Sequence, residues 1–152
     1  MRKKLTVVVP VLALLATVAL ASAREAKEEL PAGPVRDRHE LMKGIGDNAK
    51  IIGDAMKSGD FGPVGGAAEK IQASAAKILP LFPEGSTDPK SRAKPEIWTH
   101  WSKFETDAKD LEKTAAALAA AAKSGAGVPT AAKTMFGSCK SCHDQFRIPE
   151  KD

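Results

Sequence analysis

The feature that most constrains the fold is a run of apolar residues that recurs at alternating spacings of four and three positions between residues 97 and 122. The stripe consists of Ile97, Trp101, Phe104, Ala108, Leu111, Ala115, Leu118 and Ala122. This spacing follows the turn of an α-helix, so it predicts one long amphipathic helix from about Pro95 to Lys123. Such a helix needs partners that cover its apolar face.

Three further segments show helical periodicity, and none shows the alternation typical of a strand. Their inward stripes are Val35, Arg38, Met42, Ile45, Ala49, Ile52 and Met56; Val64, Ala68, Ile71, Ala75 and Ile78; and Ala132, Met135, Cys139, Cys142 and Phe146. We expect helices over 35–58, over 63–79 and from 129 onward, with a proline-rich surface connection at 80–95. Four amphipathic helices predict an all-α, antiparallel four-helix bundle, in which ligand sites lie in the core between facing helices.

Residues 1–23 have the three regions of a secretory signal peptide. The leader "MRKK" is positive, residues 5–20 are apolar, and "ASA" at 21–23 is a small-x-small cleavage site. The apolar run of 16 residues contains Pro10, whereas a membrane-spanning helix needs about 20. We therefore expect cleavage after Ala23, export to the periplasm of a bacterium, and a flexible mature N-terminus over residues 24–34.

Cleavage changes the charge of the chain. The leader contains Arg2, Lys3 and Lys4 and no acid, so Lys+Arg falls from 23 to 20 against 19 Asp+Glu, and the net charge falls from +4 to +1. The mature chain has no concentrated basic block, which gives no support for a nucleic-acid partner. We expect no membrane insertion after cleavage either.

The two cysteines of the chain, Cys139 and Cys142, stand directly before His143 in a C-x-x-C-H motif. This motif is the haem attachment signature of c-type cytochromes, in which the thiols form thioethers and the histidine is the proximal iron ligand. A redox dithiol, a zinc site and a disulfide are the alternatives. The dithiol motif normally opens a helix in a βαβ fold, zinc needs a fourth ligand, and a bridge across two residues is strained. The sequence therefore predicts one covalent haem c.

Four segments, "SCKSCHDQFR", "LPLFPEGS", "AKPEIW" and "RHELMKGIG", give the mature chain a resemblance to the cytochrome c prime family and its low-spin branch. The resemblance covers nearly the whole mature chain. It implies that residues 35–152 form a four-helix cytochrome domain, with the haem held in the bundle near the C-terminal helix. It also implies that Arg38 pairs with a haem propionate and that Met42 occupies the distal position.

Met42 leaves two states open. If its sulfur binds iron, the haem is six-coordinate, which suits electron transfer; if it only covers the iron, the haem is five-coordinate and can bind NO or CO. We favour ligation, because a thioether is a good iron ligand. His39, which stands where many relatives have Gln, and His100 lie on less clean inward stripes, so neither is expected to bind iron.

The first functional hypothesis is a periplasmic electron carrier of a respiratory or photosynthetic-type chain, working with redox partner proteins. The alternative is a gas-binding protein that binds NO or CO or detoxifies NO. Enzyme activity is not expected, because the distal stripe offers Met42, Ile45 and Ala49 rather than an acid–base group. The resemblance allows a monomer or a homodimer.

Overall fold

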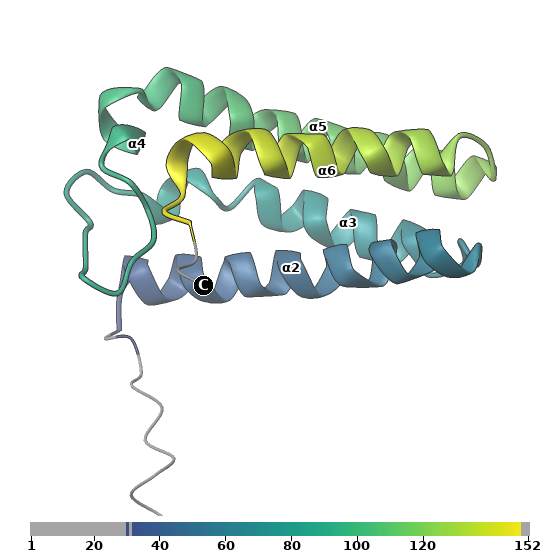
Figure 1. Ribbon diagram of the computed structural model, residues 1–152, viewed down its shortest axis with the longest axis horizontal. Coiled ribbons are helices and arrows are strands. Elements are labelled where there is room, and N and C mark those ends of the chain that lie inside the picture. The colour runs from purple at the N-terminus through teal and green to yellow at the C-terminus, as the bar shows by residue number, and fades with distance from the viewer. Residues whose placement is uncertain (1–29, 31, 150–152) are drawn as a thin grey trace, which may run out of the picture. The chain divides into compact units, whose positions relative to one another are not determined.

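The computed structural model describes Leu30 and residues 32–149, which fold as an antiparallel four-helix bundle (Figure 1). The prediction of an all-α bundle is confirmed. The four long helices are α2 (Pro34–Ser58), α3 (Val64–Ala75), α5 (Trp101–Ser124) and α6 (Val128–Phe146), and two short elements, η2 (Leu79–Leu81) and α4 (Glu96–Thr99), stand between α3 and α5. The predicted signal peptide and most of the predicted mature N-terminus lie outside the described residues. No helix in the described part is long and apolar enough to cross a membrane.

Glycines end two of the long helices at the positions where the sequence places the stops. Gly59 follows α2 with φ 77° and Gly125 follows α5 with φ 73°. Both have left-handed backbone, which residues other than glycine adopt only at a cost. The Gly59 N–H donates to the Ala55 carbonyl oxygen at 2.9 Å, so the last turn of α2 closes on itself.

The core is continuous along the bundle, but the helix pairs do not contribute equally. α3 packs extensively on α5, α5 on α6 and α2 on α3, whereas α2 and α6 touch only sparsely. In Figure 1, α2 lies beside α3 and α5 lies beside α6. The largest fully buried side chains are Ile52, Val64, Ile71, Ile97, Leu118, Val128 and Met135.

The expectation of one unbroken helix from Pro95 to Lys123 is wrong, because the chain leaves the helical conformation at His100, where φ is −121° and ψ is 41°. The break gives α4 a direction of its own, and the Trp98 Nε1–H donates to the carbonyl oxygens of Phe82 and Pro83 at 3.2 and 3.1 Å. It also changes the register of the stripe. Ile97 stays buried, but Trp101, predicted to face the core, is 36% exposed.

The second helix is shorter than predicted, since α3 ends at Ala75 rather than Leu79. The N–H groups of Lys77 and Ile78 donate to the carbonyls of Ser74 and Ala75, three residues back, so the chain tightens as it approaches Pro80. Ala76 and Ile78 keep right-handed helical backbone, so the chain passes from α3 into the tighter turn of η2. Ile78 remains buried despite the change.

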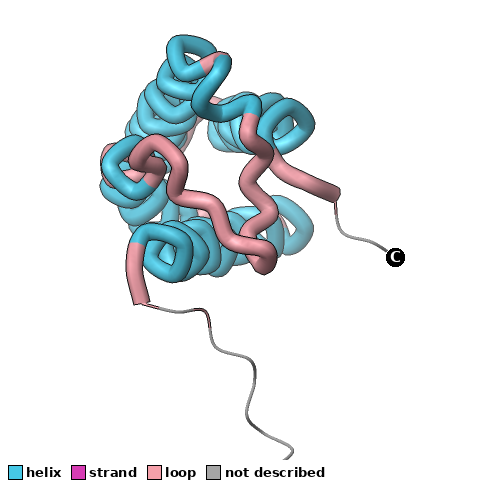
Figure 2. The backbone as a smooth tube through the Cα atoms, turned by 90° about the vertical axis from the view of Figure 1, so that its left-hand side faces the viewer, coloured by secondary structure: helices cyan, strands magenta, loops and turns pink. Residues whose placement is uncertain are grey.

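The 82–95 connection runs across one end of the bundle, as Figure 2 shows. It joins the end of α6, where the Lys94 N–H donates to the Phe146 carbonyl at 2.9 Å and the Ile148 N–H donates to that of Arg92 at 2.7 Å. The connection is not purely superficial, because Phe82 is buried and its ring centroid lies 4.8 Å from that of Phe104. The chain segment just after the cysteine motif is therefore tied to the rest of the molecule.

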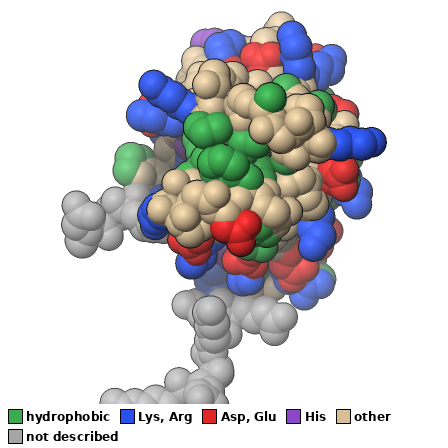
Figure 3. Space-filling view, turned by 90° about the vertical axis from the view of Figure 1, so that its right-hand side faces the viewer, with side chains coloured by type: hydrophobic (Ala, Val, Ile, Leu, Met, Phe, Trp, Pro, Cys, Tyr) green, Lys and Arg blue, Asp and Glu red, His purple; other side chains and the backbone are tan. Residues whose placement is uncertain are grey.

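Short turns close the opposite end, between α2 and α3 and between α5 and α6. The space-filling view of this end shows apolar side chains gathered at its centre and charged side chains around them (Figure 3). Phe61, in the first of these turns, is 36% exposed. This end lies away from the 82–95 connection and the end of α6.

Candidate haem site

The motif cysteines are carried on α6, on the helix face that packs against the core. Ala132, Met135 and Phe146 of this face are buried, and Cys139 and Cys142 are half-buried against the core cluster. The hydroxyl oxygens of Thr114 on α5 and Ser138 on α6 lie 3.2 Å apart, which fixes the two helices beside the motif. The α-helical backbone therefore presents both thiols toward the bundle, as the sequence predicts.

Both thiols are free, and their surroundings keep them protonated. Burial raises the pKa of the Cys139 thiol. Burial and then the negative charge of Asp107 raise the pKa of Cys142 to about 12. Catalytic and redox-active dithiols have lowered thiol pKa values, because the thiolate is the nucleophile. The environment of this pair therefore disfavours the redox-dithiol interpretation.

His143 follows the pair at the surface of the same helix. Desolvation by neighbouring atoms, and then the positive charges of Arg147 and Arg92, lower the pKa of its ring. The imidazole is accordingly neutral at pH 7, which is the form that can bind a metal ion. Among the described residues, no group of three or more His, Cys, Asp and Glu side chains is arranged to hold a metal ion.

Met42 lies on α2, half-buried and packed against the core cluster. It therefore belongs to a helix that α6 touches only sparsely, while the cysteines belong to α6 itself. Met42, Cys139 and Cys142 are each packed against the core but only half-buried, so these two helices present apolar groups that are not fully covered. The thiol and thioether groups available there fit a haem.

Arg38, one turn before Met42, is buried, with only 4% of its surface exposed. Its guanidinium donates to the Ser86 Oγ, the Ser86 carbonyl oxygen and the Ser91 Oγ at 2.8, 2.7 and 3.0 Å, and lies 4.8 Å above the centre of the Phe82 ring. Desolvation lowers its pKa, and the charge of Asp88 partly opposes this shift. The inward position is as predicted, and the hydrogen bonds hold the 82–95 connection; pairing with a propionate stays a prediction.

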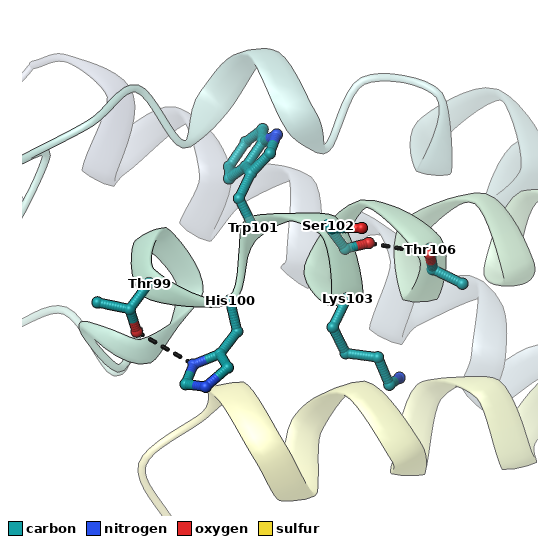
Figure 4. Close-up of a pocket in the computed structure, with 6 residues that line it drawn as sticks. All are labelled: Thr99, His100, Trp101, Ser102, Lys103 and Thr106. Carbon is teal, nitrogen blue, oxygen red and sulfur yellow. Dashed lines mark hydrogen bonds between the residues drawn. The ribbon is translucent and has the colours of Figure 1, made fainter.

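The two other histidines lie at the surface. His39 is exposed on α2, and His100 lies at the break between α4 and α5. His100 lines a shallow surface hollow, shown in Figure 4, whose walls are residues 99–103 and Thr106. This hollow contains neither motif cysteine nor Met42, so it is distinct from the candidate haem site.

The sequence reasoning missed one charged residue of the site. Asp107 of α5 is only 5% exposed, receives a hydrogen bond from Lys103 Nζ, and acts electrostatically on Cys142. The signal was present, because Asp107 directly precedes Ala108 of the apolar stripe and lies three residues after Phe104. An acid at the edge of such a stripe is a candidate for burial.

Comparison with known proteins agrees with this geometry. The family model described as Cytochrome C' matches residues 33–147. The chain belongs to the cytochrome c' family and is therefore a haem protein of that family.

Individual relatives span most of the chain. Cytochrome c' of Rhodospirillum rubrum is 31% identical over 150 residues, which cover 95% of this chain and 98% of that protein. Cytochrome c-556 of Agrobacterium fabrum is 35% identical over 121 residues, covering 77% of this chain and 82% of that protein. The solved structure of cytochrome c' from Thermochromatium tepidum superposes with a TM-score of 0.71 at 27% identity, covering 76% of this chain and 95% of the other.

Proposed function

We propose that this protein is an exported electron carrier with one haem c, attached covalently through Cys139 and Cys142. His143 is the proximal iron ligand and Met42 the sixth ligand. The observation that carries the proposal is the placement of half-buried Cys139 and Cys142 on α6 and of half-buried Met42 on α2, two long helices that touch each other only sparsely. Membership of a haem-protein family supports it.

Each residue of the proposed site has its own role. The two cysteines hold the cofactor at a fixed place on α6, and the neutral ring of His143 offers a nitrogen to the metal. The thioether of Met42 stands on the opposing helix, where a ligated sulfur keeps small molecules from the iron. Bound haem supplies a one-electron couple between ferric and ferrous iron. Because α3 and α5 are tightly packed, we expect the helices to keep their positions when the iron changes its redox state.

The decisive measurement is the absorption spectrum of the reduced protein with and without CO, repeated for Met42→Ala. We expect a low-spin spectrum that CO leaves unchanged in the natural protein and a spectrum that shifts at once with CO in the variant. Met56→Ala is the matched control, because Met56 is another half-buried methionine of α2, 14 residues further on. It should behave like the natural protein.

A high-spin spectrum in the natural protein that shifts at once with CO would overturn Met42 ligation. It would favour the alternative function, a five-coordinate protein that binds NO or CO. A CO response in both variants, but not in the natural protein, would mean that the packing of α2 as a whole, rather than the sulfur of Met42, excludes ligands.

Export and processing are tested on the purified protein. We expect intact-mass analysis of the periplasmic fraction to give a chain that begins at Arg24 and carries one covalent haem. Retention of residues 1–23 would contradict cleavage at Ala23.

Redox partner proteins, rather than a chemical substrate, are the expected partners, and the protein itself is proposed to catalyse no reaction.

A further inference from the structure

An ion pair with one buried member stands on α5, opposite the part of α6 that carries the motif cysteines. The Asp107 side chain is 5% exposed, whereas that of Lys103 is 48% exposed and extends toward α6 in Figure 4. Lys103 Nζ donates to the Asp107 Oδ1, and the other carboxylate oxygen, Oδ2, is buried with no donor among the described residues. Half of this carboxylate thus has no hydrogen-bond partner in the described part of the chain.

The pair is held next to α6 by packing on both sides. The rings of Phe104 on α5 and Phe146 on α6 meet edge to face with centroids 5.4 Å apart, and Leu111 and Ala108 of the same face of α5 are buried. Further along the same two helices, the hydroxyl oxygens of Thr114 on α5 and Ser138 on α6 lie 3.2 Å apart. Asp107 stands between Phe104 and Thr114 on α5, so it lies opposite the stretch of α6 between Ser138 and Phe146, which contains Cys142. A cofactor joined to Cys142 therefore lies close to both groups.

We propose that the Asp107–Lys103 pair sets the reduction potential of the haem, the carboxylate lowering it and the ammonium group opposing that effect. The inference rests on the proposed attachment of haem to Cys142. A negative charge favours ferric over ferrous iron, because the ferric state carries one more positive charge. The interaction is strong where water is excluded and weak where water and salt screen it, so the burial of Asp107 decides its size.

A structural role alone does not account for the pair. Lys109 and Glu105 form an ion pair at the same spacing on the same helix, with side chains 64% and 38% exposed, as is usual for a solvated helix surface. Asp107 is instead buried, where an ion pair is commonly less stabilising than apolar residues of similar volume. A buried charge at this position therefore suggests a role other than stability.

The test is a spectroelectrochemical titration of the holoprotein and its variants. We expect Asp107→Asn to raise the equilibrium constant for reduction about tenfold, which is about 59 mV for a one-electron couple. Lys103→Met should lower it by about threefold, since it removes the opposing and more exposed charge. The double variant should fall between the two. The matched controls, Glu105→Gln and Lys109→Met, should each change it by less than about twofold at moderate salt.

Opposite signs for the two variants support the inference, because a purely structural defect would not reverse with the sign of the charge removed. Shifts in the same direction, or shifts no larger than those of the controls, would overturn it. If Asp107→Asn does not fold, Lys103→Met decides alone, since Lys103 is half-exposed and is not one of the buried core residues. If the natural protein itself carries no covalent haem, the proposed function is wrong and the inference falls with it.

Discussion

The two sides of the bundle are built differently. Between α3 and α5, Val64, Ala68, Ile71, Ala115 and Leu118 are completely buried. An added Cβ at Gly65 would stand 3.5 Å from that of Ala122, so the backbones of these two helices approach closely. Between α2 and α6, the facing residues Met42, Ala49, Cys139 and Cys142 are only half-buried.

This difference assigns stability mainly to the α3–α5 side and the proposed function mainly to the α2–α6 side. The α3–α5 side is filled by its own side chains, so it can hold the fold without help. The α2–α6 side carries the chemical groups of the site and makes few contacts of its own. We therefore expect substitutions on the first side to change the free energy of unfolding, and those on the second to change the haem.

The largest expected effect is on the site side. Cys142→Ser removes one thioether and Cys139→Ser the other, so the double variant should lose covalent haem completely. Peroxidase staining of a denaturing gel, which retains only covalent haem, measures how much haem stays attached. A double variant that still stained would show that attachment does not use this motif.

On the packed side, Leu118→Ala should lower the free energy of unfolding by about 2–5 kcal/mol, because a fully buried leucine leaves a cavity that its neighbours fill only in part. Its haem spectrum should remain that of the natural protein. Chemical denaturation followed by circular dichroism provides the measurement. A loss below about 1 kcal/mol would mean that this side is less rigid than its burial suggests.

Arg38 ties α2 to the 82–95 connection, because its guanidinium donates hydrogen bonds to Ser86 and Ser91. Arg38→Met keeps the apolar part of the side chain but leaves the oxygens of Ser86 and Ser91 without their donor. We expect a loss of about 2–3 kcal/mol, as is typical for hydrogen bonds to a charged group. Lys43→Met on the same helix is the control, because the ion pair of Lys43 with Asp47 is exposed, and it should cost less than about 0.5 kcal/mol. Equal losses would show that the connection is held by other contacts.

The smallest effect is expected at Gly44, which lies on the side of α2 away from Met42, two residues along the helix. No atom lies within 4 Å of a Cβ built there. Gly44→Ala should raise the free energy of unfolding by about 0.5–1 kcal/mol, the difference in helix propensity. The CO response should not change. A change in that response would mean that the haem side extends further around α2 than the burial pattern indicates.

The sequence predicted the helices more successfully than their ends. α2 begins and ends close to the expected residues, and α6 begins close to the expected one, because apolar periodicity, prolines and glycines act locally. The break at His100 was missed, since the four-and-three spacing continues across it. The break is accompanied by a tertiary contact, the hydrogen bonds of Trp98 to the 82–95 connection.

The family that the motif at 139–143 and its surroundings indicated is confirmed by the match over residues 33–147. The inward positions of Cys139, Cys142, Met42 and Arg38 are as expected. The partners of Arg38 in the 82–95 connection and the burial of Asp107 were not anticipated. Both depend on residues that are distant in the chain, such as Ser86 and Ser91 for Arg38, and on the packing of α6 against α5 for Asp107.

The sequence by itself determined the helical faces and the C-x-x-C-H motif that predicts haem attachment, because both depend on residues within a few positions of one another. Only the tertiary structure decided which helices press together and which stand apart. It also decided which charges are removed from water, because burial is a property of the neighbours that folding brings in. The two charges beside Cys142 are the clearest case: the sequence places them four residues apart on one helix, and folding buries one and leaves the other half-exposed.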